Sequence, residues 1–85
     1  MKAVEIYTIG TCPYCIRAKA LLDKKKVSYT ERRVDHTPAL ADEATRRSGG
    51  RTTVPQIFID GVHVGGCDEL YALEKEKKLD ALLGL

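Results

Sequence analysis

The sequence predicts an α/β fold in which helices flank a four-stranded mixed sheet, in the chain order βαβαββα. One reason is that a β-rich run, a stretch of helical period and a second β-rich run follow one another within the first 34 residues. That succession is typical of a βαβ unit with parallel strands and a right-handed crossover. The second reason is the Asp60-Gly61 dipeptide between two apolar runs, which indicates a hairpin.

The first strand, helix and second strand make up the βαβ unit. Residues 3–9 are apolar and rich in β-formers. The period then becomes helical, and Pro13 suits the first turn because its missing N–H would be unpaired there. Lysines 24–26 are expected in the last turn, where positive charge complements the helix dipole. Residues 27–34 then alternate as a strand does. One helical stripe consists of Cys15, Ala18 and Leu22.

The second half of the chain predicts two further strands between two helices. A helix is expected to begin at Pro38 and to end at Gly49. Residues 53–59 and 62–64 form the strands of the hairpin. Acidic residues then start another helix, before a final leucine-rich turn. Charged side chains four apart predict two ion pairs on the helix after Pro38, namely Asp42 with Arg46 and Glu43 with Arg47.

Composition and charge indicate one ordinary globular domain over residues 1–85. The chain is 44% hydrophobic and 31% charged, and its net charge of +2 is too small to indicate a nucleic-acid partner. No apolar run is long enough to cross a bilayer, and the N-terminal residues lack the pattern of a signal peptide. We therefore expect a cytoplasmic monomer without a nucleic-acid or membrane partner.

Cys12 and Cys15 allow three interpretations: a structural disulfide, half of a zinc site, or a reversible redox pair. A structural disulfide fits poorly, because it would close almost no loop and the chain has three cysteines, an odd number. A zinc site needs four ligands, and the other candidates do not complete a recognised pattern. Those candidates are His36, His63 and Cys67. We expect no metal, and we expect Cys67 to be a packing residue.

The redox interpretation agrees with the position of the pair at the start of a helix. Cys12 follows the first strand and is expected at an exposed helix tip, where backbone N–H groups and the helix dipole favour a thiolate. Cys15 lies one turn further along, on the apolar stripe, and is expected to be buried and protonated. One sulfur can therefore attack a disulfide while the other resolves the intermediate, as thiol–disulfide exchange requires.

Three motifs resemble those of the glutaredoxins, in particular the small bacterial dithiol class. They are CPYC at 12–15, TVP at 53–55 and GGCDEL at 65–70, and the resemblance extends over residues 4–83. It implies a thioredoxin-like fold and an enzyme that reduces protein disulfides and glutathione mixed disulfides. Glutathione would be the reductant, and no cofactor would be tightly bound.

The resemblance also implies roles for single residues. Cys12 would be the nucleophile and Cys15 the resolving thiol, and the bond before Pro55 would be cis. The backbone of Val54 can pair with an extended tripeptide. The first N–H groups of the helix after the hairpin can bind a carboxylate, and Asp68 can take the ammonium of glutathione. The residues expected to contact glutathione are Tyr14, Arg51, Thr53, Val54, Pro55, Gly66, Cys67 and Asp68.

One position departs from the family pattern, and two alternatives stay open. Glutaredoxins often have a lysine where this chain has Ile9, so the basic partner of glutathione is expected to be Arg51 or Arg17. Ile9 also favours a first alternative, a glutaredoxin-like thioredoxin that a flavoprotein reductase reduces, although the carboxylate site near Asp68 argues against it. The second alternative, from another class, is a protein that binds zinc or an iron–sulfur cluster.

Overall fold

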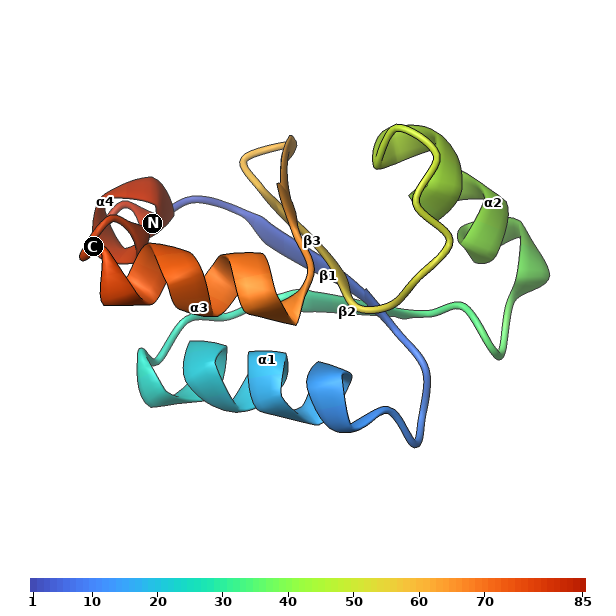
Figure 1. The fold of residues 1–85 in the computed structure, drawn as a ribbon, viewed down its shortest axis with the longest axis horizontal. Coiled ribbons are helices and arrows are strands. Elements are labelled where there is room, and N and C mark those ends of the chain that lie inside the picture. The colour runs from blue at the N-terminus through green and yellow to red at the C-terminus, as the bar shows by residue number, and fades with distance from the viewer.

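A four-stranded sheet runs through the middle of the molecule, and helices lie against both of its faces (Figure 1). The computed structural model describes residues 1–85. The predicted α/β architecture is confirmed, and the leucine-rich end of the chain forms a short helix of its own. None of the helices has both the length and the apolar character that a membrane span needs. The elements are β1 (Val4–Thr8), α1 (Pro13–Lys24), β2 (Thr30–Arg33), α2 (Pro38–Arg47), β3 (Gln56–Ile59), β4 (Val62–Gly65), α3 (Cys67–Lys75) and α4 (Leu79–Leu83).

The strand order β2-β1-β3-β4 brings three distant segments to one end of the sheet. β1 pairs in parallel with β2 and antiparallel with β3, and in the second pair Tyr7 lies opposite Gln56. β4 runs antiparallel to β3, with Gly65 opposite Ile57. The end of β1, the start of β3 and the end of β4 therefore meet at the same end of the sheet. The loops at these three points carry the predicted site residues.

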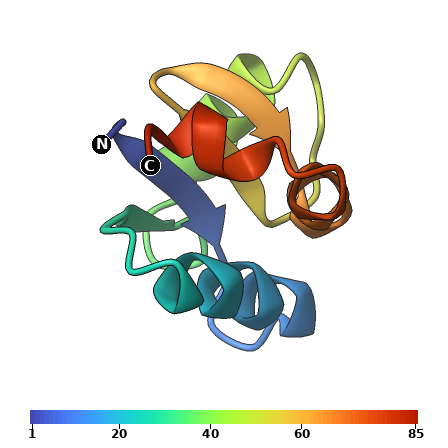
Figure 2. The same ribbon diagram turned by 90° about the vertical axis from the view of Figure 1, so that its left-hand side faces the viewer.

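The two faces of the sheet carry cores of different size. α1 and α3 lie side by side on one face, and α2 lies on the other (Figure 1 and Figure 2). Successive residues of β1 point to opposite faces, so Ile6 belongs to the large core and Tyr7 to the small one. Burial of a side chain such as Ile6 contributes about 1.5–3 kcal/mol relative to exposure. The small core consists of Tyr7, Ala44 and Phe58, and the large one of Val4, Ile6, Ala18, Leu21, Leu22, Val27, Ile57, Ile59, Cys67, Leu70, Leu79 and Leu83.

The predicted ion pairs within α2 are wrong. Arg47 donates hydrogen bonds to Glu5 at 2.8 and 3.1 Å and to the Tyr7 hydroxyl at 2.6 Å, so it does not pair with Glu43. Glu43 accepts a hydrogen bond from the Tyr7 hydroxyl instead, and the second predicted pair is also absent. The reason is that Glu5 and Tyr7 on β1 provide partly buried hydrogen-bonding partners for the side chains of α2. Such partners are less screened by solvent than a neighbour on the exposed helix face.

Three strands are shorter than predicted. β1 spans Val4–Thr8 instead of residues 3–9, one residue less at each end. β2 begins at Thr30 instead of residue 27, and Val27 is buried beyond the end of α1. β3 begins at Gln56 instead of residue 53, because Pro55 has no N–H to donate to a sheet. The Val54–Pro55 peptide bond is cis, as the resemblance implies. Val54 therefore lies outside the sheet, and its backbone groups are available to other partners.

Both α1 and α3 end with a lysine in the left-handed region of the backbone. Lys26, expected in the last turn of α1, lies beyond it with φ of 58°. The N–H groups of Lys26 and Val27 donate to the carbonyls of residues 23 and 22, at 2.9 and 3.1 Å. Lys77 closes α3 in the same way, with φ of 60°. This Schellman arrangement favours glycine, because a Cβ is strained at positive φ.

Replacing Lys26 or Lys77 by glycine should stabilise the protein by about 1 kcal/mol at either position. Glycine removes the strain of a Cβ at positive φ, which amounts to roughly 1–2 kcal/mol. This gain exceeds the roughly 0.5–1 kcal/mol that folding costs because glycine has more conformational freedom in the unfolded chain. Thermal unfolding followed by circular dichroism measures the change. Lys24→Gly is the matched control inside the helix, and it should destabilise by about 1 kcal/mol. A lower melting temperature for all three variants would contradict the prediction.

Candidate active site

Cys12 is the N-cap residue of α1. Its backbone is extended, with φ of −92° and ψ of 115°, and Pro13 occupies the first helical position. The Cys12 Sγ accepts a hydrogen bond from the N–H of Cys15 at 3.3 Å. The sulfur therefore takes the place of the serine or threonine oxygen in an ordinary N-cap, where N–H groups and the helix dipole favour negative charge.

Cys12 is more covered than its position at a helix tip suggests. Only 8% of its surface is exposed, so the expectation of an exposed Cys12 is wrong. Its Sγ lies 3.9 Å from the carbonyl oxygen of Val54, in the segment before β3. This contact joins residues 42 positions apart in the sequence, so the residue pattern of the helix alone could not predict it.

Cys15 is fully buried, as predicted, and keeps its proton at neutral pH. Burial is the main cause that raises the pKa of the Cys15 thiol to about 12, and the hydrogen bond with Cys12 adds to it. Both cysteines are free thiols, so the structure shows the reduced form of the pair. Since Cys15 holds its proton, the sulfur at the helix tip is the one suited to attack first.

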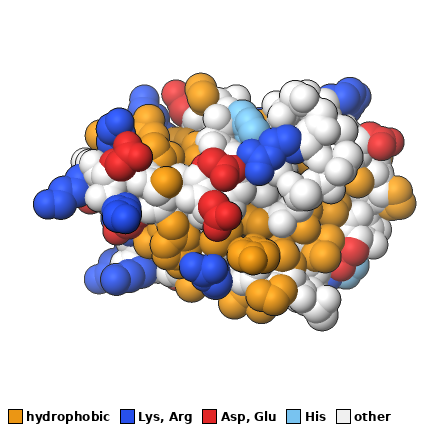
Figure 3. All heavy atoms as spheres, in the orientation of Figure 1, with side chains coloured by type: hydrophobic (Ala, Val, Ile, Leu, Met, Phe, Trp, Pro, Cys, Tyr) orange, Lys and Arg blue, Asp and Glu red, His pale blue; other side chains and the backbone are white.

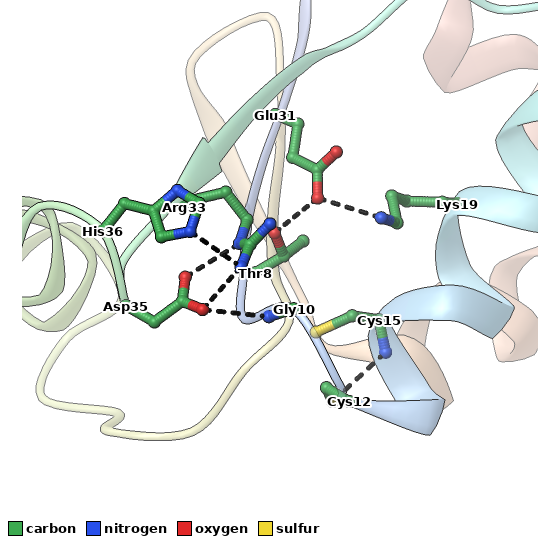
Figure 4. Close-up of polar contacts among 9 residues, drawn as sticks. All are labelled: Thr8, Gly10, Cys12, Cys15, Lys19, Glu31, Arg33, Asp35 and His36. Atoms are coloured by element: carbon green, nitrogen blue, oxygen red, sulfur yellow. Dashed lines mark hydrogen bonds and ion pairs between the residues drawn. The ribbon is translucent and has the colours of Figure 1, made fainter.

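Charged side chains hold the loop that leads to Cys12 (Figure 4). The N–H of Gly10 donates to the Asp35 carboxylate at 3.2 Å, and Arg33 donates two hydrogen bonds to the same carboxylate at 2.6 and 2.8 Å. A Cβ on Gly10 would collide with the Arg33 guanidinium, so glycine permits this close approach. The Arg33 guanidinium holds the pKa of Asp35 well below its usual range. The loop is thereby tied to the segment after β2.

A second polar cluster joins the end of β1 to α1. Glu31 on β2 accepts hydrogen bonds from the Thr8 hydroxyl at 2.6 Å and from the Lys19 ammonium at 2.9 Å (Figure 4). These two contacts, that of Thr8 first, lower the pKa of Glu31. Lys19 follows Cys15 by one helical turn. The cluster therefore holds the helix that carries both cysteines against the sheet.

A pocket of about 310 Å³ opens where the segment before β3 meets the start of α3. Figure 3 shows acidic and basic side chains next to one another over the start of α3, above an apolar band between α1 and α3. Tyr14, 54% exposed, borders the pocket from α1. All eight residues predicted to contact glutathione line this pocket: Tyr14, Arg51, Thr53, Val54, Pro55, Gly66, Cys67 and Asp68.

Glu69, the fifth residue of the GGCDEL motif, also lines the pocket, although the resemblance implied no role for it. Its Oε1 accepts hydrogen bonds from the N–H of Gly66 at 2.7 Å and from Nη1 of Arg51 at 2.8 Å. The Gly66 N–H and then the Arg51 guanidinium lower the pKa of Glu69. The available signal was its place three residues after the N-cap, where a glutamate side chain can accept a hydrogen bond from the N-cap N–H. Asp68, by contrast, is exposed and takes part in no salt bridge.

Of the two arginines expected as basic partners, Arg51 lines the pocket and Arg17 does not. The Arg17 guanidinium lies over the rings of Tyr14 and Tyr71, 6.0 and 5.2 Å from their centroids. Ile9 is half-buried and also lies outside the pocket lining. Arg51 is therefore the cation placed to meet an anionic ligand in this pocket.

The other candidate metal ligands have separate surroundings. Cys67 packs into the large core, as predicted, and also borders the pocket. His63 lies 2.7 Å from the side-chain oxygen of the buried Gln56, whereas His36 lies 3.2 Å from Arg33. No group of three or more histidine, cysteine, aspartate or glutamate side chains is arranged to hold a metal ion.

Comparison with known proteins agrees with this geometry. The family model described as Glutaredoxin matches residues 4–64. Glutaredoxin 3 of Escherichia coli K12 is 60% identical over 83 residues, which cover 98% of this chain and 99% of the relative. The solution structure of a glutaredoxin from Brucella melitensis is 59% identical with a TM-score of 0.85, over 98% of this chain and 89% of that one. The crystal structure of a buckwheat glutaredoxin–glutathione complex is 29% identical with a TM-score of 0.89, over 98% and 77% of the two chains.

These matches confirm the thioredoxin-like fold that the motifs implied. The similarity to the relatives extends over 98% of the chain and so includes the Cys12–Cys15 pair, the turn before β3 and the start of α3. The chain belongs to the glutaredoxin family and is a glutathione-dependent thiol–disulfide oxidoreductase that works through the Cys12–Cys15 dithiol.

Proposed function

We propose that the protein reduces protein disulfides and glutathione mixed disulfides, with glutathione bound in the pocket beside Cys12. We also propose that it acts as a single-domain monomer in the cytoplasm, a compartment in which glutathione is kept reduced. The observation that carries the proposal is the 3.9 Å contact between the Cys12 Sγ and the carbonyl oxygen of Val54. Because Val54 also lines the pocket, glutathione in the pocket would have its sulfur within reach of Cys12.

The groups around the pocket suit the charged ends of glutathione. The first N–H groups of α3 lie at the positive end of the helix and suit the γ-glutamyl carboxylate. The Asp68 carboxylate, which takes part in no salt bridge, suits the ammonium group. The Arg51 guanidinium suits the glycyl carboxylate. Val54 lies outside the sheet, so its backbone can pair with the cysteinyl residue as an added strand would.

In the monothiol route, the Cys12 thiolate attacks the glutathione sulfur of a mixed disulfide. The S–S bond of the substrate breaks, the substrate protein leaves as a thiol after taking up a proton, and a Cys12–glutathione disulfide remains. A second glutathione thiolate then attacks the bound glutathione sulfur. This step releases oxidised glutathione and regenerates the Cys12 thiolate.

In the dithiol route, Cys12 attacks a protein disulfide, and one substrate sulfur leaves and takes up a proton. Cys15 then loses its proton and attacks the Cys12 Sγ, which expels the second substrate sulfur as a thiol. The product is the Cys12–Cys15 disulfide. Two glutathione molecules reduce it in turn and become oxidised glutathione.

The proposal is tested by supplying electrons from two sources. Glutathione with glutathione reductase and NADPH should support turnover of a glutathione–cysteine mixed disulfide, whereas thioredoxin reductase with NADPH should not. Turnover with thioredoxin reductase alone would favour the thioredoxin-like alternative. Purified protein that carries zinc or a coloured cluster, and turns over with neither source, would favour the metal-binding alternative.

Cys12→Ser should abolish turnover of both substrate classes, because Cys15 is fully buried and keeps its proton. Cys15→Ser should lose most reduction of protein disulfides but retain turnover of glutathione mixed disulfides, where a second glutathione resolves the intermediate. Glutathione-coupled turnover with one substrate of each kind measures both effects, and melting temperatures show that the variants are folded. Activity that survives in Cys12→Ser and disappears in Cys15→Ser would identify Cys15 as the nucleophile.

Closure of the Cys12–Cys15 disulfide should accelerate about tenfold for each unit of pH between about 7 and 9. The raised pKa of the Cys15 thiol, about 12, means that its thiolate fraction keeps growing throughout this range. Rapid acid quenching after reduced protein is mixed with oxidised glutathione measures the step, with the mixed and internal disulfides separated by mass. A rate that levels off near the ordinary thiol pKa of about 8.5 would show that Cys15 is not held protonated.

Asp68→Asn should raise KM for glutathione mixed disulfides about 5- to 30-fold and leave kcat unchanged. The variant removes the charge that meets the γ-glutamyl ammonium, a contact worth about 1–2 kcal/mol at a partly exposed site. Glutathione-coupled kinetics measure KM and kcat. Asp42→Asn, an exposed aspartate on α2 without a salt bridge, is the matched control for the charge change. Unchanged kinetics with a lower melting temperature would assign Asp68 to helix stability alone.

A further inference from the structure

Glu69 forms a bridge at the mouth of the pocket. A single oxygen, Oε1, accepts hydrogen bonds from the N–H of Gly66 at 2.7 Å and from Nη1 of Arg51 at 2.8 Å. The bridge therefore joins the start of α3 to the loop before β3. Both side chains are less than half exposed, at 43% for Glu69 and 42% for Arg51. The bond to Glu69 is the only hydrogen bond that the Arg51 guanidinium forms within the protein.

Gly65 makes room for this bridge. Gly65 has φ of +126°, and a Cβ there would collide with the Glu69 side chain. A Cβ on Gly66 would lie 3.2 Å from the Pro55 carbonyl oxygen, and at an ordinary contact distance of 3.6 Å from both Nη2 of Arg51 and Oε1 of Glu69. The carboxylate and the guanidinium thus lie close over the start of α3. Nη2, the nitrogen that Glu69 does not use, lies beside the backbone of Gly66, which lines the pocket.

We propose that Glu69 is a positioning residue for glutathione, which holds Arg51 by Nη1 and leaves its other donors free for the glycyl carboxylate. The inference rests on the proposed function, in which Arg51 binds that carboxylate. The donors of a guanidinium form a rigid planar fork, so a partner on one nitrogen sets the direction of the others. A side chain that is already ordered also loses less rotamer freedom when the ligand binds.

Helix capping alone is the competing role for Glu69. Glutamine at this position separates the two roles. Its amide oxygen can still accept a hydrogen bond from the N–H of Gly66, but it lacks the negative charge that holds Arg51. If Glu69 acts only as a cap, Glu69→Gln keeps that hydrogen bond and should leave KM unchanged. If Glu69 positions Arg51, the same variant should raise KM.

The experiment compares Glu69→Gln, Arg51→Gln and the double variant with the wild type. Glutathione-coupled kinetics give KM and kcat for a glutathione–cysteine mixed disulfide and for the same substrate with a glycine carboxamide in place of the carboxylate. Glu76→Gln is the matched control, because it makes the same change of charge at the far end of α3, where Glu76 pairs with Lys78.

Glu69→Gln is expected to raise KM about two- to five-fold without changing kcat, an effect of the size of a partly exposed ion pair. Arg51→Gln is expected to raise KM at least as much. The double variant should match Arg51→Gln, because Glu69 has no further effect once its guanidinium partner is absent. The carboxamide substrate should show a smaller response to Glu69→Gln, and Glu76→Gln should behave as the wild type.

Three results would overturn the inference. If Arg51→Gln raises KM and Glu69→Gln leaves it unchanged or lowers it, Glu69 is a cap or a competitor of the ligand, and the proposed pocket stands. If Glu76→Gln has the same effect as Glu69→Gln, only the net charge matters. If Arg51→Gln leaves KM unchanged, Arg51 does not bind the glycyl carboxylate, and Glu69 cannot act by positioning it.

Discussion

The antiparallel pairing of β1 with β3 is the constraint on which the active site depends. With Tyr7 opposite Gln56, the chain leaves β1 toward Cys12 at the same end of the sheet at which it enters β3 from Pro55. β4 is antiparallel to β3 and therefore brings Gly65 and the start of α3 to that end as well. Hydrogen bonds between strands thus assemble a site from three loops that are far apart in the sequence.

Polar contacts then fix those loops, and their main contribution is to geometry. The loop before Cys12 is tied through Gly10 to Asp35, and the loop before β3 is tied through Arg51 to Glu69. Ion pairs as exposed as these contribute only about 0–1 kcal/mol to stability. In each case a glycine leaves space for one of the charged side chains, Gly10 for the Arg33 guanidinium and Gly65 for Glu69. The absence of side chains is therefore as important to this site as the charges themselves.

The chemistry depends on two sulfurs that differ although they lie one helical turn apart. Cys12 caps α1, and its Sγ accepts a hydrogen bond from the N–H of Cys15 at the positive end of the helix. Cys15 points into the protein, and its burial raises the pKa of its thiol to about 12. This difference sets an order of events, in which Cys12 reacts first and Cys15 reacts once a disulfide has formed beside it.

Local patterns in the sequence were enough to predict the βαβ unit, the hairpin at Asp60 and the place of Cys12 at a helix start, because each depends on residues within a few positions of one another. Tertiary structure decided the rest. It covered Cys12 with the loop of Val54, gave Arg47 a partner on β1, and joined Arg51, which was already expected in the glutathione site, to Glu69. Each of these contacts joins segments that only the register of the sheet brings together, and no spacing along the chain encodes that register.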